Sequence, residues 1–234
     1  MSDGTTEGTV ISHPSPNHGA RRGATRPCLI VLHYTAMESA EAALQRLCDP
    51  QAEVSAHYLI CEQGRIWQMV DEAERAWHAG AGRWGACCDV NSASIGIELA
   101  NRGDHPFAEA QMRALEGLLP AIMRRWHIPP EGVIGHSDMA PGRKGDPGRR
   151  FDWARLERQG LARRRGENTG LEASAGRDDP DPACFRGLAR ELGYSAEVDD
   201  ATLLEAVRLR YRPWGTGPLA REDCTALGTA SHWT

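Results

Sequence analysis

The chain has 234 residues, of which 41% are hydrophobic and 25% are charged. This length allows one good hydrophobic core and leaves residues for a small second unit. The formal net charge of -5 excludes a strongly basic nucleic-acid-binding face, because such a face needs many lysines and arginines to neutralise phosphates. We therefore expect an ordinary globular protein with no nucleic acid among its partners.

The N-terminal stretch and the cysteines bear on location. Residues 1–26 are polar and rich in Gly, Pro, Ser and Thr, which predicts a tail or strap, and they lack the apolar core of a signal peptide. No later stretch is apolar for long enough to predict a membrane span. The seven cysteines show neither the paired spacing of a secreted disulfide framework nor a CxxC zinc clasp. We expect reduced thiols and a cytoplasmic protein, with an envelope location as the alternative.

The chain between residues 28 and 70 predicts a strand, a helix and a hairpin. The apolar run 28–33 is typical of a strand buried on both faces, and it ends in a histidine. A helix is predicted from an N-cap at Ser39 to Cys48. Segments 57–61 and 65–70, separated by a loop that contains glycine, predict a hairpin. The sheet is therefore expected to be at least partly antiparallel.

The segment SIGIEL, residues 94–99, predicts a further strand. Its two isoleucines and its leucine alternate with Gly96 and Glu98, so a strand buries the apolar set on one face and turns the glutamate to the other. Because glycine has no side chain, we expect open space beside Glu98.

The second half of the chain predicts mostly helices. Apolar residues at helical spacing predict a helix over 109–127, bent where Pro120 removes a backbone hydrogen bond. Residues 132–136 predict a short strand that again ends in a histidine. The expected fold is mixed α+β, with a central mixed sheet flanked by helices and a small C-terminal helical domain. The predicted parts are a tail at 1–26, a catalytic domain at 27–160, a linker at 161–182 and a helical unit at 183–234.

Two histidines at strand ends and one aspartate form a candidate zinc site. A catalytic zinc needs three protein ligands and one open position, so that it lowers the pKa of a bound water to about 7. His33 and His136 end apolar runs in which a sheet can hold their imidazoles rigidly. Asp146 lies ten residues after His136 in a loop able to fold back. These three residues are the predicted ligands.

His57 and His78 have several interpretations. His57 begins a predicted strand, and His78 lies in the segment AWHAG. Each is compatible with binding the metal, supporting a ligand or contacting substrate, and we favour the last two. The other histidines lie in the tail, a turn, a helix end and the terminus, where solvent-facing or hydrogen-bonded side chains are typical: His13, His18, His105, His127 and His232.

Five motifs occur in a distinctive order. They are LHYT at 32–35, SAHYLI at 55–60, AWHAG at 76–80, SIGIEL at 94–99 and GHSDMAPGRKGDPG at 135–148. This order resembles that of N-acetylmuramoyl-L-alanine amidases of the AmpD and AmiD kind, and five ordered motifs are far more specific than one. The resemblance covers about residues 12–158. The C-terminal helical unit resembles the peptidoglycan-binding-type domain of the AmiD branch.

That resemblance implies a fold, a cofactor and a reaction. The implied fold is that of amidases and peptidoglycan-recognition proteins. The implied cofactor is one zinc ion per chain, with Glu98 and Lys144 as catalytic residues beside the three ligands. The implied reaction hydrolyses the amide between the lactyl group of N-acetylmuramic acid and L-alanine in peptidoglycan fragments. Preference for anhydro sugars, stem-peptide length, action on polymeric wall and oligomeric state stay open.

The implied roles suit these residue types. Zinc held by two neutral imidazoles and one carboxylate keeps a net positive charge, which favours hydroxide over water. Glu98 is expected to accept the proton of the water and to pass it to the leaving amine. Lys144 is expected to stabilise the oxyanion that forms at the carbonyl.

Further residues are candidate substrate contacts, because loops between strands commonly supply binding groups. Arginines among them suit the carboxylates of an acidic stem peptide. The candidates are His57, Trp77, His78, Arg83, Trp84, Asn91, Arg102 and Arg143.

Two other functions were considered. A non-catalytic peptidoglycan-recognition protein would keep the groove without hydrolysis, but intact Glu98 and Lys144 argue against it. A cysteine hydrolase would use Cys87 or Cys88 with a histidine, yet neither lies in a nucleophile motif or a strand-to-helix turn. The amidase therefore remains the favoured hypothesis.

Overall fold

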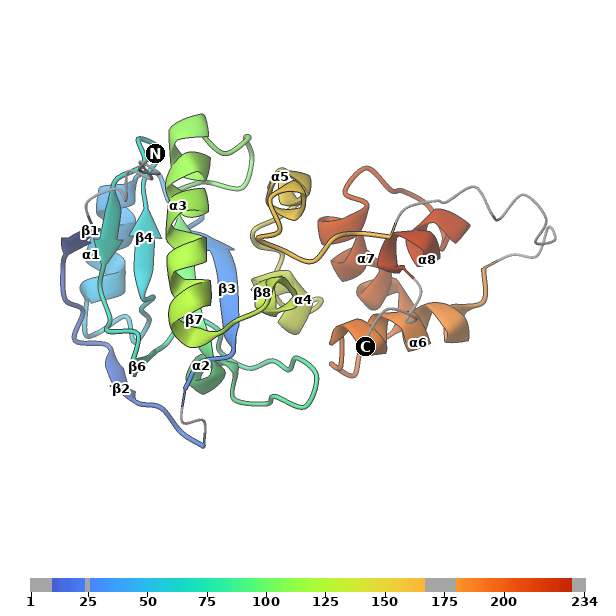
Figure 1. The fold of residues 1–234 in the computed structure, drawn as a ribbon, viewed down its shortest axis with the longest axis horizontal. Helices are drawn as coiled ribbons and strands as arrows, with labels where there is room; N and C mark the ends of the chain where they lie inside the picture. Colours follow the sequence, from blue (N-terminus) through green and yellow to red (C-terminus); the bar gives the residue numbers. More distant parts are fainter. Residues whose placement is uncertain (1–9, 24–25, 167–179, 229–234) are drawn as a thin grey trace, which may run out of the picture.

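The computed structural model describes residues 10–23, 26–166 and 180–228. A sheet with its covering helices comes first in the chain, and a group of helices follows at the C-terminal end (Figure 1). The strands are β1 (Val10–Ser12), β2 (His18–Ala20), β3 (Leu29–Tyr34), β4 (Tyr58–Ile60), β5 (Ile66–Gln68), β6 (Glu74–Ala76), β7 (Ser94–Leu99) and β8 (Val133–Gly135). The helices are α1 (Ala40–Cys48), α2 (Val90–Ala93), α3 (Glu109–Trp126), α4 (His136–Met139), α5 (Trp153–Arg158), α6 (Pro182–Leu192), α7 (Asp200–Tyr211) and α8 (Arg221–Leu227), with a 3-10 turn at Pro130–Gly132.

The main sheet is mixed. Its six strands lie in the order β1-β5-β4-β7-β3-β8, and β2 pairs with β6 in a separate two-stranded sheet. Strand β3 runs parallel to both of its neighbours, β7 and β8, whereas β4 and β5 form the predicted antiparallel hairpin. The predicted mixed sheet flanked by helices is confirmed.

Local sequence explains where the elements begin and end. Ser39 caps α1 as predicted, because its side chain accepts a hydrogen bond from the backbone N–H of Ala42. Helix α3 continues through Pro120, and the bend expected there stays a prediction. The strand expected over 132–136 is shorter: it ends at Gly135, and His136 instead begins the short helix α4.

One face of the sheet packs against α3. Residues of a strand point alternately to its two faces, and Ile30 and Leu32 of β3 point to this one. With Leu115 and Leu119 of α3 they belong to one buried cluster. Figure 1 shows α3 lying across the strands on this side. Apolar packing therefore holds α3 against this face.

The opposite face is divided between two smaller cores. Leu59 of β4 packs in a cluster with Leu47 of α1 at one end. Leu29 and Val31 of β3 pack at the other end, in a cluster that also contains Phe185 of α6. Polar residues of β3 and β7 lie between the two cores, and His33 and Glu98 are paired across these strands.

The C-terminal helices α6, α7 and α8 share a core with the sheet. Phe185, Val207 and Leu227 belong to the same buried cluster as Val31 and Ile134. Figure 1 shows these helices gathered at the end of the molecule nearest β8 and α4. The predicted boundaries at 161 and 182 stay predictions, and much of the predicted linker lies outside the described residues. The start of that segment is buried, since Leu161 is 8% exposed.

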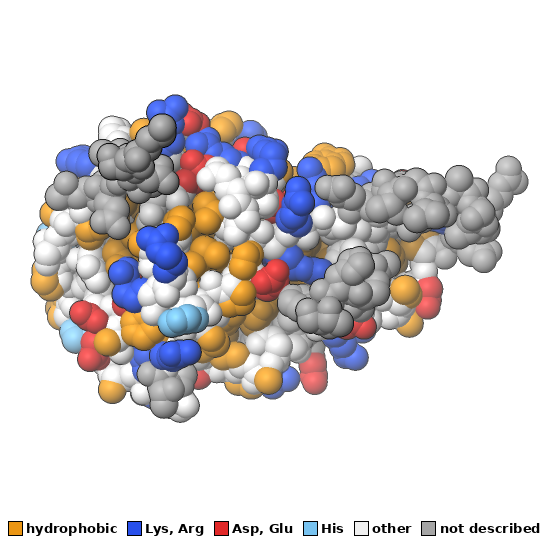
Figure 2. Space-filling view, viewed as in Figure 1, with side chains coloured by type: hydrophobic (Ala, Val, Ile, Leu, Met, Phe, Trp, Pro, Cys, Tyr) orange, Lys and Arg blue, Asp and Glu red, His pale blue; other side chains and the backbone are white. Residues whose placement is uncertain are grey.

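The surface of the α3 side carries mixed charges. Figure 2 shows basic, acidic and apolar side chains distributed together over the described residues of this face. None of the described helices is long and apolar enough to cross a membrane.

Candidate metal centre

The sheet brings the three predicted ligands together. His33 lies near the carboxyl end of β3, and His136 directly follows the neighbouring parallel strand β8. Both histidines therefore lie at the carboxyl ends of these strands. The Asp146 Oδ2 atom lies 2.9 Å from Nδ1 of His33 and 3.0 Å from Nδ1 of His136. All three residues are buried, and their donor atoms lie within 4.8 Å of one another.

The hydrogen-bond partners of the two rings make this cluster fit a cation. Nε2 of His136 lies 2.9 Å from the carbonyl oxygen of Ala79, which only accepts, so Nε2 carries the proton and the Nδ1 lone pair faces the cluster. Burial lowers the pKa of His33 to about 4, so the His33 ring is neutral near pH 7. The two Nδ1 atoms are 2.9 Å apart. Two lone pairs and a carboxylate that converge in this way suit a bound zinc ion.

His78 supports His33 from behind. Nε2 of His33 lies 3.0 Å from Nδ1 of His78, and Nε2 of His78 lies 3.2 Å from the hydroxyl of Ser94. That hydroxyl donates onward to the carbonyl of Val90. In this series of hydrogen bonds, His33 donates through Nε2, and its Nδ1 lone pair faces the cluster. This arrangement is common around metal-binding histidines.

Gly96 makes room for that support. A Cβ atom at Gly96 would lie 2.4 Å from the His78 ring, so any larger residue would displace the imidazole. The space beside Glu98 that was expected to be open is therefore occupied by His78. The sequence pattern identified the missing side chain at Gly96 correctly but not the ring that fills its place.

Glu98 lies beside the cluster on β7, in register with His33. Its Oε2 atom is shielded from solvent and has no hydrogen-bond partner among the described residues. Burial raises the pKa of Glu98 to about 8, and the charge of Asp146 adds to this while Lys144 opposes it. A carboxyl group in this condition can accept or release a proton near neutral pH.

The loop that carries Lys144 is fixed by its neighbours. The backbone N–H of Lys144 donates to Ala140, and the N–H of Ser137 donates to the carbonyl of Asp146. The guanidinium of Arg143 donates to the carbonyls of Ala79 and Ala81. Arg143 thus ties the loop of the predicted ligand Asp146 to the segment that supports His136, and its contact with substrate stays a prediction.

A small cavity of about 180 Å³ lies beside the cluster. Its lining includes the three predicted ligands, Glu98, Lys144, Trp77 and His78. Thr35 and Arg46 lie on the lining as well, and sequence reasoning did not find them. Thr35 belongs to the LHYT motif and was available as a signal. Arg46 reaches the cavity only because α1 packs beside the sheet, so no local pattern marks it.

The other predicted substrate contacts are engaged within the protein. His57 is fully buried, its Nδ1 accepts from the N–H of Gly96, and its Nε2 lies 3.1 Å from the carbonyl of Glu74. The side-chain oxygen of Asn91 accepts from the N–H groups of His78 and Ala79. Asn91 thus holds the segment of His78 in position, and both residues lie outside the lining of the cavity.

Arg102, Trp84 and the cysteines lie elsewhere. Arg102 pairs with Glu38 and Asp104 on the surface. Trp84 packs its ring edge-to-face with Tyr194 of the C-terminal helices, at 5.0 Å between centroids. Burial raises the pKa of the Cys87 thiol, which disfavours the thiolate that a cysteine hydrolase needs.

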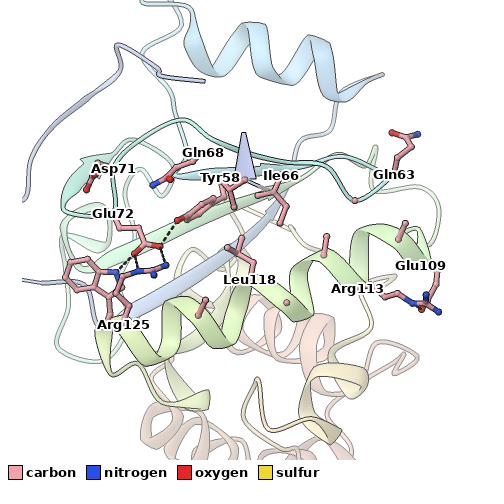
Figure 3. Close-up of a pocket in the computed structure, with 17 residues that line it drawn as sticks. Tyr58, Gln63, Ile66, Gln68, Asp71, Glu72, Glu109, Arg113, Leu118 and Arg125 are labelled. Carbon is pink, nitrogen blue, oxygen red and sulfur yellow. Dashed lines mark hydrogen bonds and ion pairs between the residues drawn. The ribbon is translucent and has the colours of Figure 1, made fainter. Parts of the chain in front are cut away.

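A larger cavity lies on the α3 side of the sheet. It has a volume of about 1030 Å³ and is lined by residues of α3 and of the β4–β5 hairpin (Figure 3). Figure 3 shows Glu72 directed at one end toward Tyr58 and Arg125. The carboxylate accepts from the Tyr58 hydroxyl at 2.7 Å, from Arg125 Nε at 2.6 Å and from Trp126 Nε1 at 2.5 Å. The carboxylate of Glu72 thus already has its hydrogen-bond partners within the protein.

Fold and site together define a mixed α/β protein with a cluster of possible metal ligands at the carboxyl ends of its parallel strands. Comparison with known families identifies which one. The model of the family N-acetylmuramoyl-L-alanine amidase matches residues 23–149, more than half of the 234 residues. The chain belongs to this family, and the resemblance inferred from five motifs is confirmed.

Individual relatives extend the likeness. The N-acetylmuramoyl-L-alanine amidase AmiD of Escherichia coli is 37% identical over 211 residues, which cover 79% of this chain and 75% of AmiD. The 1,6-anhydro-N-acetylmuramyl-L-alanine amidase AmpD of Haemophilus influenzae is 35% identical over 159 residues, 60% of this chain and 86% of AmpD. Both relatives are hydrolases of the amide class.

Solved structures agree. AmiD from Escherichia coli, in complex with the substrate anhydro-N-acetylmuramic acid-L-Ala-D-gamma-Glu-L-Lys, has a TM-score of 0.78 at 35% identity, covering 88% of this chain and 91% of AmiD. AmpDH3 from Pseudomonas aeruginosa has a TM-score of 0.77 at 32% identity, covering 92% and 93%. Coverage this large extends beyond residue 149, so the likeness includes C-terminal helices.

Proposed function

We propose that the protein is a zinc-dependent N-acetylmuramoyl-L-alanine amidase. It cleaves the amide between N-acetylmuramic acid, or its anhydro form, and L-alanine in muropeptides, and it acts in peptidoglycan recycling. The observation that supports this most is the convergence of His33, His136 and Asp146 beside the unpartnered Oε2 atom of Glu98. Family membership and the substrate complex of AmiD point to the same reaction.

The three ligands and the cofactor have distinct parts in this proposal. Bound zinc supplies a Lewis acid that polarises the amide carbonyl and makes an attacking water more acidic. His33 and His136 offer neutral Nδ1 atoms, fixed by His78 and by the carbonyl of Ala79. Asp146 offers a carboxylate oxygen between them.

Glu98 moves the proton. Its Oε2 atom accepts the proton of the attacking water and later donates it to the amine nitrogen of L-alanine as the C–N bond breaks. No described group forms a hydrogen bond to that oxygen, so it is available for the water. A pKa raised to about 8 by burial suits a group that must both take and return a proton near neutral pH.

Lys144 stabilises the developing charge. Its ammonium group lines the same cavity and donates to the carbonyl oxygen when that oxygen becomes negative. Trp77 and Thr35 also line the cavity, and they are the proposed substrate contacts. The resemblance of the C-terminal helices to a peptidoglycan-binding-type domain favours contact with polymeric wall.

Mass spectrometry of reaction products tests the proposal. Purified protein is incubated with anhydromuropeptides and with intact sacculi, with and without a metal chelator. We expect free stem peptide with L-alanine at its N-terminus, about one zinc per chain, loss of turnover with chelator and recovery when zinc is restored. Activity that survives exhaustive metal removal contradicts the metal mechanism. A zinc-loaded protein that binds muropeptides without cleaving them supports the non-catalytic alternative.

A further inference from the structure

A buried carboxylate connects the metal-ligand helix to the C-terminal helices. Asp138 lies in α4, two residues after His136, and is completely buried. Its Oδ2 atom accepts from the backbone N–H of Gly135 at 2.8 Å and from Arg210 of α7, also at 2.8 Å. Its Oδ1 atom accepts from the hydroxyl of Tyr194 at 2.5 Å. Two of its three donors therefore come from the C-terminal unit.

Arg210 is built into this position. It is 3% exposed, and its guanidinium lies 4.3 Å from the centre of the Trp153 ring and 5.1 Å from that of Tyr211. A buried charge of this kind is tolerated only with a close partner, because leaving one charge unpaired in the interior is strongly unfavourable. The pair with Asp138 thus fixes where α7 and α4 meet.

The C-terminal unit also contacts the loop that contains Trp84. Gly193 contacts Trp84 so closely that a Cβ atom there would lie 2.4 Å from the indole. The N–H of Gly85 donates to the carbonyl of Gly193, and the N–H of Arg83 donates to the carbonyl of Met139 at the end of α4. The loop and the helix are therefore held as one assembly.

Helix α4 needs such outside support. It has four residues, and a helix of one turn has too few hydrogen bonds to be stable by itself. His136 is its first residue, so the orientation of α4 decides where the His136 ring points. Within α4 the fully buried carboxylate of Asp138 is the group that reaches the C-terminal unit through side-chain hydrogen bonds.

We propose that the C-terminal helical unit positions the metal ligand His136, with Tyr194 and Arg210 acting through Asp138. This inference rests on the proposed metal function. It assigns the C-terminal unit a role within the catalytic centre, in addition to any contact with cell wall. Asp138, Tyr194 and Arg210 are positioning residues, because none of them lines the cavity.

The chain offers a matched control for Asp138. Asp223 is also completely buried, is also the third residue of a short helix, and also accepts from a backbone N–H, that of Ala220, and from an arginine of α7, Arg208. It lies wholly within the C-terminal unit. Asp138→Asn and Asp223→Asn therefore disturb similar networks, but only the first adjoins a predicted ligand.

The test measures zinc affinity of the full chain by competition with a chromophoric chelator. We expect Asp138→Asn to weaken zinc binding about tenfold or more, as loss of support behind a ligand commonly does, and Asp223→Asn to change it less than about twofold. At limiting zinc the turnover of Asp138→Asn should fall, and added zinc should restore it. Equal losses in the two variants, or no loss in either, overturn the inference.

Tyr194→Phe keeps the test decisive if Asp138→Asn fails to fold. This variant removes one hydroxyl and leaves the Arg210 pair in place, and we expect zinc binding to weaken severalfold, within about tenfold. Thermal unfolding of the metal-free variants checks that they are folded. A folded Tyr194→Phe protein with unchanged zinc affinity refutes the inference. A wild-type protein that binds no zinc refutes the proposed function itself, which is a separate outcome.

Discussion

Two cavities on opposite faces of the sheet place a glutamate in opposite conditions. In the larger cavity on the α3 side, Glu72 accepts hydrogen bonds from Tyr58, Arg125 and Trp126. In the smaller cavity beside the predicted ligands, the Oε2 atom of Glu98 has no partner among the described residues. Burial raises the pKa of Glu98 to about 8. Burial also acts to raise the pKa of Glu72, but its hydrogen bonds outweigh that effect and lower it.

This difference teaches that the state of the buried carboxyl group distinguishes the two cavities in a way that volume does not. The larger cavity of about 1030 Å³ would be the default choice by size, and the cavity of about 180 Å³ would not. A buried polar atom without a partner is costly to stability and persists where it has another use. We therefore expect substitutions at Glu98 to affect catalysis and substitutions at Glu72 to affect stability.

The largest expected effect follows from Glu98→Gln. An amide cannot accept the proton of water, so kcat should fall by about 10²–10⁴-fold. Zinc content should be unchanged, since Glu98 is not among the three converging ligands. Steady-state kinetics and metal analysis of the same preparation measure both quantities. An unchanged kcat would remove the role assigned to Glu98.

Lys144→Met should have the next largest effect. Loss of a donor to the developing oxyanion should lower kcat by about 10²–10³-fold with little change in zinc content. Arg150→Met is the control, because Arg150 is an exposed cation a few residues further along the chain. If both variants lose activity equally, general electrostatics rather than a directed contact explains the loss.

His78→Ala should weaken metal binding by about 10–100-fold, because His33 loses the acceptor that orients its ring. Chelator competition measures the change. The control is His57→Ala, which removes another fully buried imidazole whose centroid lies 5.8 Å from that of His78. His57→Ala should lower thermal stability yet leave zinc affinity within about twofold. The opposite pattern would assign metal support to His57.

Glu72→Gln should have the smallest effect on turnover, within about twofold, while lowering the free energy of unfolding by about 1–3 kcal/mol at neutral pH. The pKa of Glu72 is lower in the folded protein, so its contribution is present above the ordinary glutamate pKa. That contribution is lost as pH falls through the folded value. Urea unfolding at several pH values should therefore show wild type and variant converging in acid. A large loss of kcat would instead make the larger cavity part of the active site.

Sequence patterns predict much of the sheet and the three residues that converge in the buried cluster. His33 ends an apolar run that becomes β3, and Glu98 alternates with buried residues in β7. Both features are local, because strand periodicity is visible over a few residues. The motif around His136 also marks it as a member of the cluster, although the residue begins a helix rather than ending a strand.

Contacts between distant segments were beyond the reach of those patterns. The ring of His78 fills the space above Gly96, and no local feature of either segment predicts the other. Arg46 enters the cavity through the packing of α1. Asp138 reads as a polar residue in a loop motif, and its pairing with Arg210 spans 72 positions in sequence. Such pairings depend on tertiary structure, which single-sequence reasoning does not supply.

The core shared by the sheet and the C-terminal helices bears on how modular this protein is. Leu29 and Val31 lie in one cluster with Phe185 and Val207, so removal of the C-terminal helices would uncover the apolar face of β3. We therefore expect a shortened chain to expose that apolar face and to lose stability. Two sequence segments thus behave as one folding unit, and a gene fusion or domain exchange at their boundary would divide a single core.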